Sequence, residues 1–377
     1  MSSDRGGSSM LAQLRNVLSA DFSTLLSSRR QLIGLDIGSS AIKLVQLKEV
    51  KGRYVLQKCA VKPLEPEVIV DGTVMDEGRV VAAIRELMSE QGIKHKQAAI
   101  SISGHAVIVK KISLPPMPDN ELAEQVKLAA EQYIPFDINE VNLDFHVLNG
   151  TDGSGDGDGQ MSILLVAAKK DKVNELCELV KTAGLTPSVM DVDAFAIQNM
   201  HEVNYPMTKG DVTTIVNIGA SVMNVNIVQN GASLFTRDIP LGGNRYTEAI
   251  QRELGLSFEE AEEVKKSERP SSSQEEVVRS VMESLNAEVA SEIGRTIDYY
   301  KSTAGDGDVE RLLLCGGGAK ASGLLEQLRD RMRVKVELAN PFQEIDCTAA
   351  DVDPATLDEM SAVAAVGVGL ALRVMGD

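Results

Sequence analysis

Two stretches of this sequence repeat one another, and the repeat restricts the folds that the chain can adopt. LIGLDIGSSAIKLVQL (32–47) and IVNIGASVMNVNIV (215–228) each read as two apolar strands joined by a short turn with glycine and serine. The aligned pairs are Asp36 with Asn217, Gly38 with Gly219, and Ser40 with Ser221. Internal similarity of this kind indicates a duplicated unit. Since 377 residues exceed what one core usually serves, we expect a duplicated α/β fold with two lobes.

The turn of each repeat carries groups that suit a phosphate. Glycine lets the backbone approach an anion without a Cβ in the way, and successive N–H groups of a tight turn form an anion-binding concavity. Ser39 and Ser40 add hydroxyl donors. Lys43 adds a cation, and Asp36 offers an oxygen to magnesium or to its waters. The second copy supplies Asn217, Gly219, Ala220 and Ser221. One such turn would more often be a plain hairpin, but two aligned copies favour a phosphate clamp.

A third glycine-rich motif strengthens this interpretation. RLLLCGGGAKASGL (311–324) reads as a strand, three consecutive glycines and a helix. Glycines before a helix N-terminus let a nucleotide approach, and the helix dipole favours negative charge there. The alternative is a tight strand-to-helix turn without a ligand. The candidate binding residues in this motif are Gly316, Gly317, Gly318 and Lys320.

Composition excludes several classes of function. Thirty-eight basic and 55 acidic residues give a formal net charge of -17, which argues against general nucleic-acid binding. The four cysteines are far apart and lack metal-site spacing. The polar start, MSSDRGGSSM, does not resemble a signal peptide. The apolar run at 362–372 is shorter than the ~20 residues that span a bilayer. We therefore expect a soluble intracellular protein.

Hydrophobic periodicity predicts alternating helices and strands between the motifs. Helices are expected over 79–91, 120–133, 171–183, 194–202 and 277–301, and strands over 143–147, 161–168, 188–191 and 309–314. Two strands, 98–102 and 107–112, are expected to pair with each other. The acidic, glycine-rich segment 151–160 lacks the spacing of a calcium loop and predicts a flexible hairpin loop.

The first 30 residues predict a flexible arm. Their apolar residues recur at helical spacing from Leu11 to Leu25, which indicates a possible amphipathic helix. Such a helix could pack on the body of the protein or dock on a partner or membrane, and the pattern does not distinguish these alternatives.

The three motifs resemble those of the actin, sugar-kinase and chaperone ATPase superfamily. LDIGSSAIK is similar to its first phosphate motif, VNIGAS to the second, and CGGGAKASG to the adenosine motif. AEEVK (261–265) is similar to a helix of bacterial actin relatives, which implies that Glu262 and Lys265 flank the ribose or adenine. A solvated helix face is the alternative for these two residues.

Within that superfamily the chain resembles the PilM family of type IV pilus assembly, and then the related protein FtsA. The phrases LIGLDIGSSAIKLVQL, ISLPPMPDNELAEQVKLAAEQYIPFDINEVNLDFHVL and MDVDAFAIQN carry this likeness, which covers about residues 32–375. It implies a first lobe of 31–96 and 170–208, an inserted FtsA-type subdomain at 97–169, and a second lobe of 209–377.

The resemblance also implies cofactors, partners and location. ATP and Mg²⁺ would bind between the lobes, and the short cytoplasmic N-terminal peptide of the membrane protein PilN would bind near the inserted subdomain. The protein would be cytoplasmic and peripheral on the inner membrane, held there by PilN. Other pilus machine proteins, including cytoplasmic motor ATPases, are possible further partners.

One departure from the superfamily pattern bears on catalysis. The second phosphate motif usually begins with Asp, whereas this chain has Asn217. A neutral amide offers no charged ligand to magnesium and cannot act as a base, so weak metal binding and slow hydrolysis are expected. Asp191 and Asp193 lie where relatives place an acidic residue near the catalytic water. Asp193 is the candidate catalytic residue, and a helix cap is its alternative role.

Three functions are compatible with these motifs. The first is an ATP-loaded scaffold whose shape depends on nucleotide. The second is a self-assembling filament of the actin or FtsA type. The third is a kinase or phosphatase of the same fold, which is disfavoured because no second motif for a small-molecule substrate is present.

Overall fold

The computed structural model describes residues 31–148, 160–208, 210–267, 274–303, 307–350 and 352–376. The predicted N-terminal arm and the predicted loop at 151–160, apart from its last residue, lie outside this part of the chain. The strands are β1 (Ile33–Ile37), β2 (Ala41–Val50), β3 (Arg53–Pro63), β4 (Ile69–Val70), β5 (Thr73–Val74), β6 (Gln97–Ile102), β7 (Val107–Leu114), β8 (Val141–Val147), β9 (Met161–Lys169), β10 (Thr186–Val192), β11 (Val212–Ile218), β12 (Met223–Gln229), β13 (Ala232–Ile239), β14 (Val309–Cys315) and β15 (Lys335–Leu338).

The five helices whose ranges the sequence predicts all appear, close to those ranges. The helices are α2 (Glu77–Glu90), α3 (Asp119–Tyr133), α4 (Lys170–Thr182), α5 (Asp193–Asn204), α6 (Gly243–Leu254), α7 (Phe258–Lys266), α8 (Glu275–Thr303), α9 (Leu324–Arg331), α10 (Pro354–Ser361) and α11 (Ala365–Ala371), with short 3₁₀ turns η1 (Gly104–Ala106), η2 (Ile138–Glu140) and η3 (Gly317–Lys320). Among these residues no helix combines the length and the apolar character needed to cross a membrane.

Two five-stranded sheets confirm the predicted duplication. Their strand orders are β3-β2-β1-β6-β10 and β13-β12-β11-β14-β15. In each sheet an antiparallel meander comes first, and two parallel strands follow beside its first strand. The two sheets therefore have the same topology, and the repeated turns connect equivalent strands, β1 to β2 and β11 to β12.

The two sheets share a hydrophobic core that holds the lobes together. One cluster of buried side chains combines residues of β2 and β3, of α5 and α11, and of β11 and β14. Helix α11 packs very closely because its glycines remove side chains: a Cβ on Gly369 would lie 1.7 Å from the Ala196 carbonyl oxygen. A Cβ on Gly34 of β1 would lie 2.1 Å from the Gly367 oxygen. The C-terminal helix therefore lies against the first sheet, although the sequence predicted the whole of 209–377 as the second lobe.

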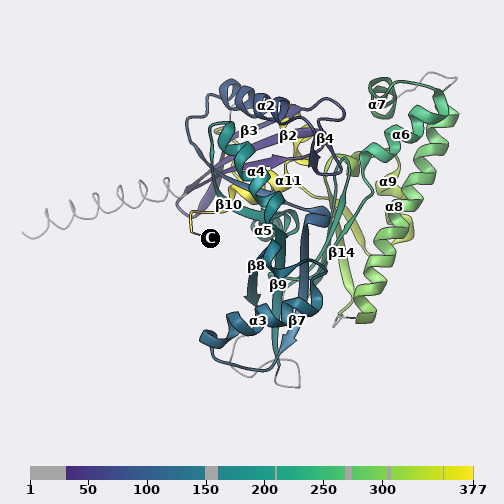
Figure 1. Ribbon diagram of the computed structural model, residues 1–377. Helices are drawn as coiled ribbons and strands as arrows, with labels where there is room; N and C mark the ends of the chain where they lie inside the picture. The colour runs from purple at the N-terminus through teal and green to yellow at the C-terminus, as the bar shows by residue number, and fades with distance from the viewer. Residues whose placement is uncertain are drawn as a thin grey trace, which may run out of the picture.

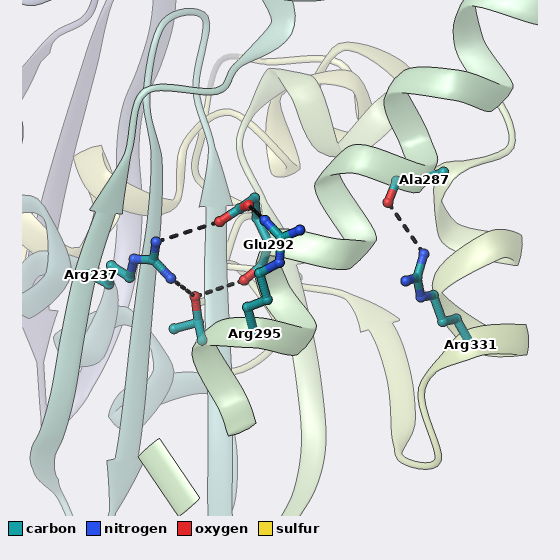
Figure 2. A network of polar contacts seen from close by, with 6 residues as sticks. Arg237, Ala287, Glu292, Arg295 and Arg331 are labelled. Carbon is teal, nitrogen blue, oxygen red and sulfur yellow. Dashed lines mark hydrogen bonds and ion pairs between the residues drawn. The ribbon is translucent and has the colours of Figure 1, made fainter. Parts of the chain in front are cut away.

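Helix α8 covers the outer side of the second sheet and runs along the right of the molecule in Figure 1. Figure 2 shows how polar contacts attach it to the sheet edge. Arg237 on β13 donates to the Thr296 hydroxyl at 3.1 Å and pairs with Glu292 at 3.5 Å. Arg295 pairs with the same carboxylate. On the other side of the helix Arg331 of α9 donates to the Ala287 oxygen at 3.3 Å.

A third sheet, β7-β9-β8, packs with α3 around its own small core and projects at the bottom of Figure 1. The predicted pairing of 98–102 with 107–112 is wrong. β6 pairs with β1 and β10 in the first sheet, whereas β7 pairs with β9. η1 separates them, and Gly104 has a φ of 73°, which turns the chain sharply out of the first sheet. The inserted unit therefore begins after Ile102 and not at residue 97.

Candidate functional site

The two repeated turns have the same local structure. Gly38 N–H donates to the Ala41 oxygen at 3.1 Å, and Gly219 N–H donates to the Val222 oxygen at 2.9 Å. The second turn is further tied to the start of α6, where Gly243 N–H donates to the Gly219 oxygen at 2.9 Å. A Cβ on the preceding Gly242 would lie 2.4 Å from the Ala220 oxygen. Glycine at 242 therefore lets α6 begin directly behind the second turn.

Both turns line one cleft between the sheets. A part of about 210 Å³ is lined by both hairpins, and an adjoining part of about 1450 Å³ lies toward α6, α7 and α8. Ser40, Gly219, Ala220 and Gly317 line both parts. The remaining predicted site residues line one part or the other: Asp36, Gly38, Ser39, Lys43, Asp193, Asn217, Ser221, Glu262, Lys265, Gly316, Gly318 and Lys320. Their role in binding a nucleotide stays a prediction.

The first hairpin carries an ion pair across its two strands. Asp36 and Lys43 are direct partners in the register, and the Lys43 Nζ lies 3.1 Å from the Asp36 Oδ2. Both side chains are largely buried. Lys43 also lies over the turn, since a Cβ on Gly38 would be 2.8 Å from its Nζ. A carboxylate and an ammonium group are thus placed together beside the backbone N–H groups of the turn.

The second hairpin replaces that ion pair with two amides. Asn217 and Asn224 occupy the equivalent register positions, and Asn217 Nδ2 donates to Asn224 Oδ1 at 3.0 Å. Both side chains are buried. The first hairpin therefore has a charged pair where the second has two neutral amides. The aligned sequence already shows this difference for Asp36 and Asn217.

The three glycines of the third motif pack differently from one another. A Cβ on Gly316 would lie 2.4 Å from the Ile218 oxygen, and one on Gly318 would lie 2.5 Å from the Ile218 Cγ2. A Cβ on Gly317 would meet only the Val363 Cγ1, at 3.7 Å. Two glycines therefore allow the turn to pack on β11, and the third faces open space in the cleft.

The helix expected directly after these glycines begins later. The turn forms η3, and α9 starts only at Leu324. η3 ends at Lys320, and Gly323, with a φ of 78°, is the N-cap of α9, so the three consecutive glycines do not lie at the N-terminus of an α-helix. Lys320 lies at the cleft edge, where its Nζ donates to the Glu359 oxygen at 2.6 Å.

Glu262 and Lys265 form a half-buried ion pair on the side of α7 that faces α6. Ser257 and Glu260 form a capping box that fixes the start of α7. Lys265 Nζ lies 2.5 Å from the Glu262 Oε2 and donates to the Thr247 hydroxyl at 2.8 Å. Burial would raise the pKa of Glu262, but Lys265 and the hydrogen bonds outweigh it and lower this pKa. Burial lowers the pKa of Lys265 despite the attraction of Glu262, and both side chains line the cleft.

The two candidate acidic residues have different environments. Asp191 is buried, and its carboxylate accepts a hydrogen bond from Arg373 Nε at 2.7 Å. Asp193 lines the cleft between the hairpins. Helix α5 begins at Asp193 with Val192 as the N-cap and no capping side chain, so the predicted cap is wrong. Asp193 is the acidic residue of the two that could reach a bound phosphate.

The pKa of the Asp193 carboxyl is raised to about 6. Burial is the main cause, and the charges of Asp36 and Asp238 add to it, while hydrogen bonds with Ser101 and Ser103 oppose it. At neutral pH the group is mostly ionised, and its pKa lies close enough to neutrality for it to accept a proton.

We expect Asp193→Asn to stabilise the nucleotide-free protein above pH 6. Because the folded pKa of about 6 exceeds the ordinary 3.8, the wild type loses folding stability as pH rises between these values, whereas Asn does not titrate. The thermal midpoint of the variant should exceed that of the wild type by a few degrees near pH 8 and match it near pH 4. Equal differences at both pH values would contradict the shifted pKa.

Several polar residues in or beside the cleft were not among the predicted site residues. Asn224 follows from the repeat, since it aligns with Lys43. Asp238 lies next to Asn224 in the hairpin of β12 and β13, whose Asn230-Gly231 turn the sequence does indicate, whereas its contact with Gly104 has no local signal. Tyr246 and Asn286 also line the cleft, and the Tyr246 hydroxyl donates to the Asn286 Oδ1 at 2.9 Å.

Comparisons with known proteins agree with this architecture. The family model described as type IV pilus assembly protein PilM matches residues 34–375. A chain of the solved PilM-PilN type IV pilus biogenesis complex is 30% identical, with a TM-score of 0.79 over 91% of this chain and 98% of that chain.

More distant relatives share the actin-like fold. MreB5 of Spiroplasma citri bound to ADP is 12% identical, with a TM-score of 0.50 over 91% of this chain and 95% of its own. FtsA of Streptococcus pneumoniae is 23% identical over 354 residues, covering 82% of this chain and 75% of FtsA. The duplicated sheets thus form an actin-like fold, and the match to one family model over nearly the whole length shows that this chain belongs to the PilM family of type IV pilus assembly proteins.

Proposed function

We propose that this chain is an ATP-binding scaffold of the type IV pilus machine that binds the cytoplasmic N-terminal peptide of PilN. The observation that carries the proposal is the convergence of three sequence motifs, far apart in the chain, on one cleft. The likeness to a chain of the PilM-PilN complex supports the partner, and the ADP-bound MreB5 relative supports a nucleotide.

The residues of the cleft fit Mg-ATP. The triphosphate would lie between the turns at Gly38 and Gly219, where N–H groups, hydroxyls and Lys43 can neutralise its charge. The adenosine would lie toward Glu262, Lys265 and the turn at Gly317. Across the described ranges no group of three His, Cys, Asp or Glu side chains could hold a metal. That suits Mg²⁺, which commonly binds through phosphates, waters and one or two carboxylates, here Asp36.

Hydrolysis should be slow in this site. Asn217 offers an amide where a carboxylate would attract the metal, and it already donates to Asn224. Asp193 is the group that would accept a proton from an attacking water. Bound magnesium would neutralise phosphate charge, and Asp193 would orient the water.

A long-lived ATP complex would serve as a conformational signal. ATP would contact both lobes and would bind more tightly when they are closed. This difference in affinity is what would shift the protein toward the closed arrangement of the lobes. The PilN site would then lie where the inserted β7-β9-β8 unit meets the first lobe. PilN would hold the protein at the inner membrane, where other pilus proteins, including motor ATPases, could contact it.

Calorimetric titration of the full chain with Mg-ATP tests the nucleotide part of this proposal. We expect micromolar or tighter binding and hydrolysis much slower than nucleotide release. A PilN N-terminal peptide should then bind several-fold more tightly to the ATP-loaded protein, with a scrambled peptide as the control. No binding of ATP in either the presence or absence of the peptide would refute the nucleotide site.

A further inference from the structure

A row of three polar side chains crosses the second sheet. Asn217 on β11, Asn224 on β12 and Asp238 on β13 are direct partners in the strand register. Asn217 Nδ2 donates to Asn224 Oδ1 at 3.0 Å, and Asn224 Nδ2 donates to Asp238 Oδ1 at 2.8 Å. Asn217 and Asn224 are 9% and 3% exposed. We call these three residues the polar row.

The polar row continues into the inserted unit. Gly104 N–H donates to the other carboxylate oxygen of Asp238 at 2.6 Å. Gly104 begins η1, at the point where the chain leaves β6 of the first sheet and enters β7 of the third sheet. One hydrogen-bonded chain therefore joins the second phosphate turn to the junction from which the inserted unit projects.

Asp238 sets the direction of every hydrogen bond in the polar row. An ionised carboxylate only accepts, so it requires the Nδ2 of Asn224 to face it. Asn224 Oδ1 must then face Asn217, which turns the Nδ2 of Asn217 toward β12 and its Oδ1 toward β14. There the Cys315 Sγ lies 3.9 Å from the Asn217 Oδ1, and a Cβ on Gly316 would lie 2.5 Å from it.

The first hairpin, all of whose residues the structure describes, has no such row. Lys43, the equivalent of Asn224, pairs with Asp36 on one side, and its register partner on β3 is the apolar Val61. Of the two repeats, it is thus the second hairpin that connects to the inserted unit in this way. Reversing a single amide within a buried chain of this kind is costly in free energy, because it leaves two donors or two acceptors facing each other.

We propose that Asp238 is a positioning residue that fixes the amide of Asn217 for nucleotide binding and couples that amide to the backbone at Gly104. This inference rests on the proposed nucleotide site and adds a route from it to the inserted unit. Coupling is reciprocal, so a nucleotide that stabilises the row also strengthens the hydrogen bond at Gly104.

The test uses two variants of the full chain: Asp238→Asn alone, and an exchange variant that combines Asp238→Asn with Asn224→Asp. In Asp238→Asn the new amide can turn only one end toward each neighbour. Either its oxygen faces Asn224 and Gly104 N–H loses its acceptor, or its oxygen faces Gly104 and the amides of Asn224 and Asn217 reverse. In the exchange variant the carboxylate now at position 224 accepts from Asn217 and from the amide now at position 238. The oxygen of that amide accepts from Gly104, so all hydrogen bonds return. Asp308→Asn is the matched control. Asp308 is exposed, pairs with Lys301 and lies far from the three residues of the polar row in the sequence.

Two quantities are measured: hydrogen exchange of the Gly104 amide without nucleotide, and Mg-ATP affinity. We expect Asp238→Asn to weaken ATP binding about tenfold, because the Asn217 amide is no longer held in one direction. Hydrogen exchange at Gly104 should become several-fold faster, because that N–H loses either its acceptor or the charge of its acceptor. The exchange variant should return the ATP affinity to within about threefold of the wild type, because the carboxylate at position 224 again fixes the Asn217 amide, whereas two independent effects would add. Asp308→Asn should change neither quantity.

An unchanged ATP affinity in Asp238→Asn, or no recovery of that affinity in the exchange variant, would overturn the proposal. If Asp238→Asn does not fold, the exchange variant decides: folding of that variant is the rescue, and failure of both overturns the inference. Lack of ATP binding by the wild type would refute the proposed function, yet the exchange at Gly104 would still test the polar row.

Discussion

Gly317→Asp should abolish detectable ATP binding while leaving the protein folded. Gly317 lines both parts of the cleft, and a Cβ there meets only the Val363 Cγ1 at 3.7 Å. Because Gly317 lies where the two parts of the cleft meet, a carboxylate there would stand at the junction of the proposed adenosine and phosphate positions, within a few ångströms of phosphate charge. Like charges about 4 Å apart repel by ~4 kcal/mol at an effective dielectric of 20, which is more than about a hundredfold in affinity. Calorimetric titration with Mg-ATP measures the loss.

Gly317→Ala is the matched control for this variant. It adds volume without charge where there is room, so its ATP affinity should stay within about threefold of the wild type. Circular dichroism and the thermal midpoint establish that both variants fold. Full ATP affinity in Gly317→Asp would remove the η3 turn from the nucleotide site, while equal losses in both variants would indicate a packing effect.

Gly369→Ala should destabilise the protein strongly, although it adds only one methyl group. The added Cβ would lie 1.7 Å from the Ala196 oxygen and 2.3 Å from its carbonyl carbon, both of them backbone atoms of α5. Helix α11 would have to move out of the core that both sheets share. Overpacking of a rigid core costs ~1–3 kcal/mol and sometimes more, and we expect at least ~3 kcal/mol here. The urea midpoint of unfolding measures it.

Gly294→Ala provides the opposite expectation with the same chemical change. Gly294 lies inside α8, and a Cβ there meets only the end of the flexible Met332 side chain, at 3.8 Å. Replacing a helical glycine by alanine then stabilises by ~0.5–1 kcal/mol. A urea midpoint for Gly369→Ala equal to or above that of the wild type would show that α11 does not pack on α5 as closely as described.

The sequence by itself determined the duplication and most of the elements. Hairpins 32–47 and 215–228 repeat the same pattern of apolar residues and turn glycines, and hydrogen bonding within a hairpin is local. Helices α3 and α8 were predicted from their apolar periodicity, which reflects one buried face. The turn glycines and Asp36, Lys43 and Asn217 were also readable, because residue type alone limits what such a turn can hold.

Only the tertiary structure decided which distant segments meet. β6 and β7 are neighbours in sequence, yet they join different sheets because each finds its partner far along the chain. α11 is apolar on all sides, so no periodicity shows that it lies between α5 and the first sheet. Asp238 faces Asn224 within the hairpin of β12 and β13, but it meets the Gly104 N–H, 134 residues away in the sequence, only in the folded structure. Pairing over such separations depends on the summed burial of whole elements, which a local pattern does not encode.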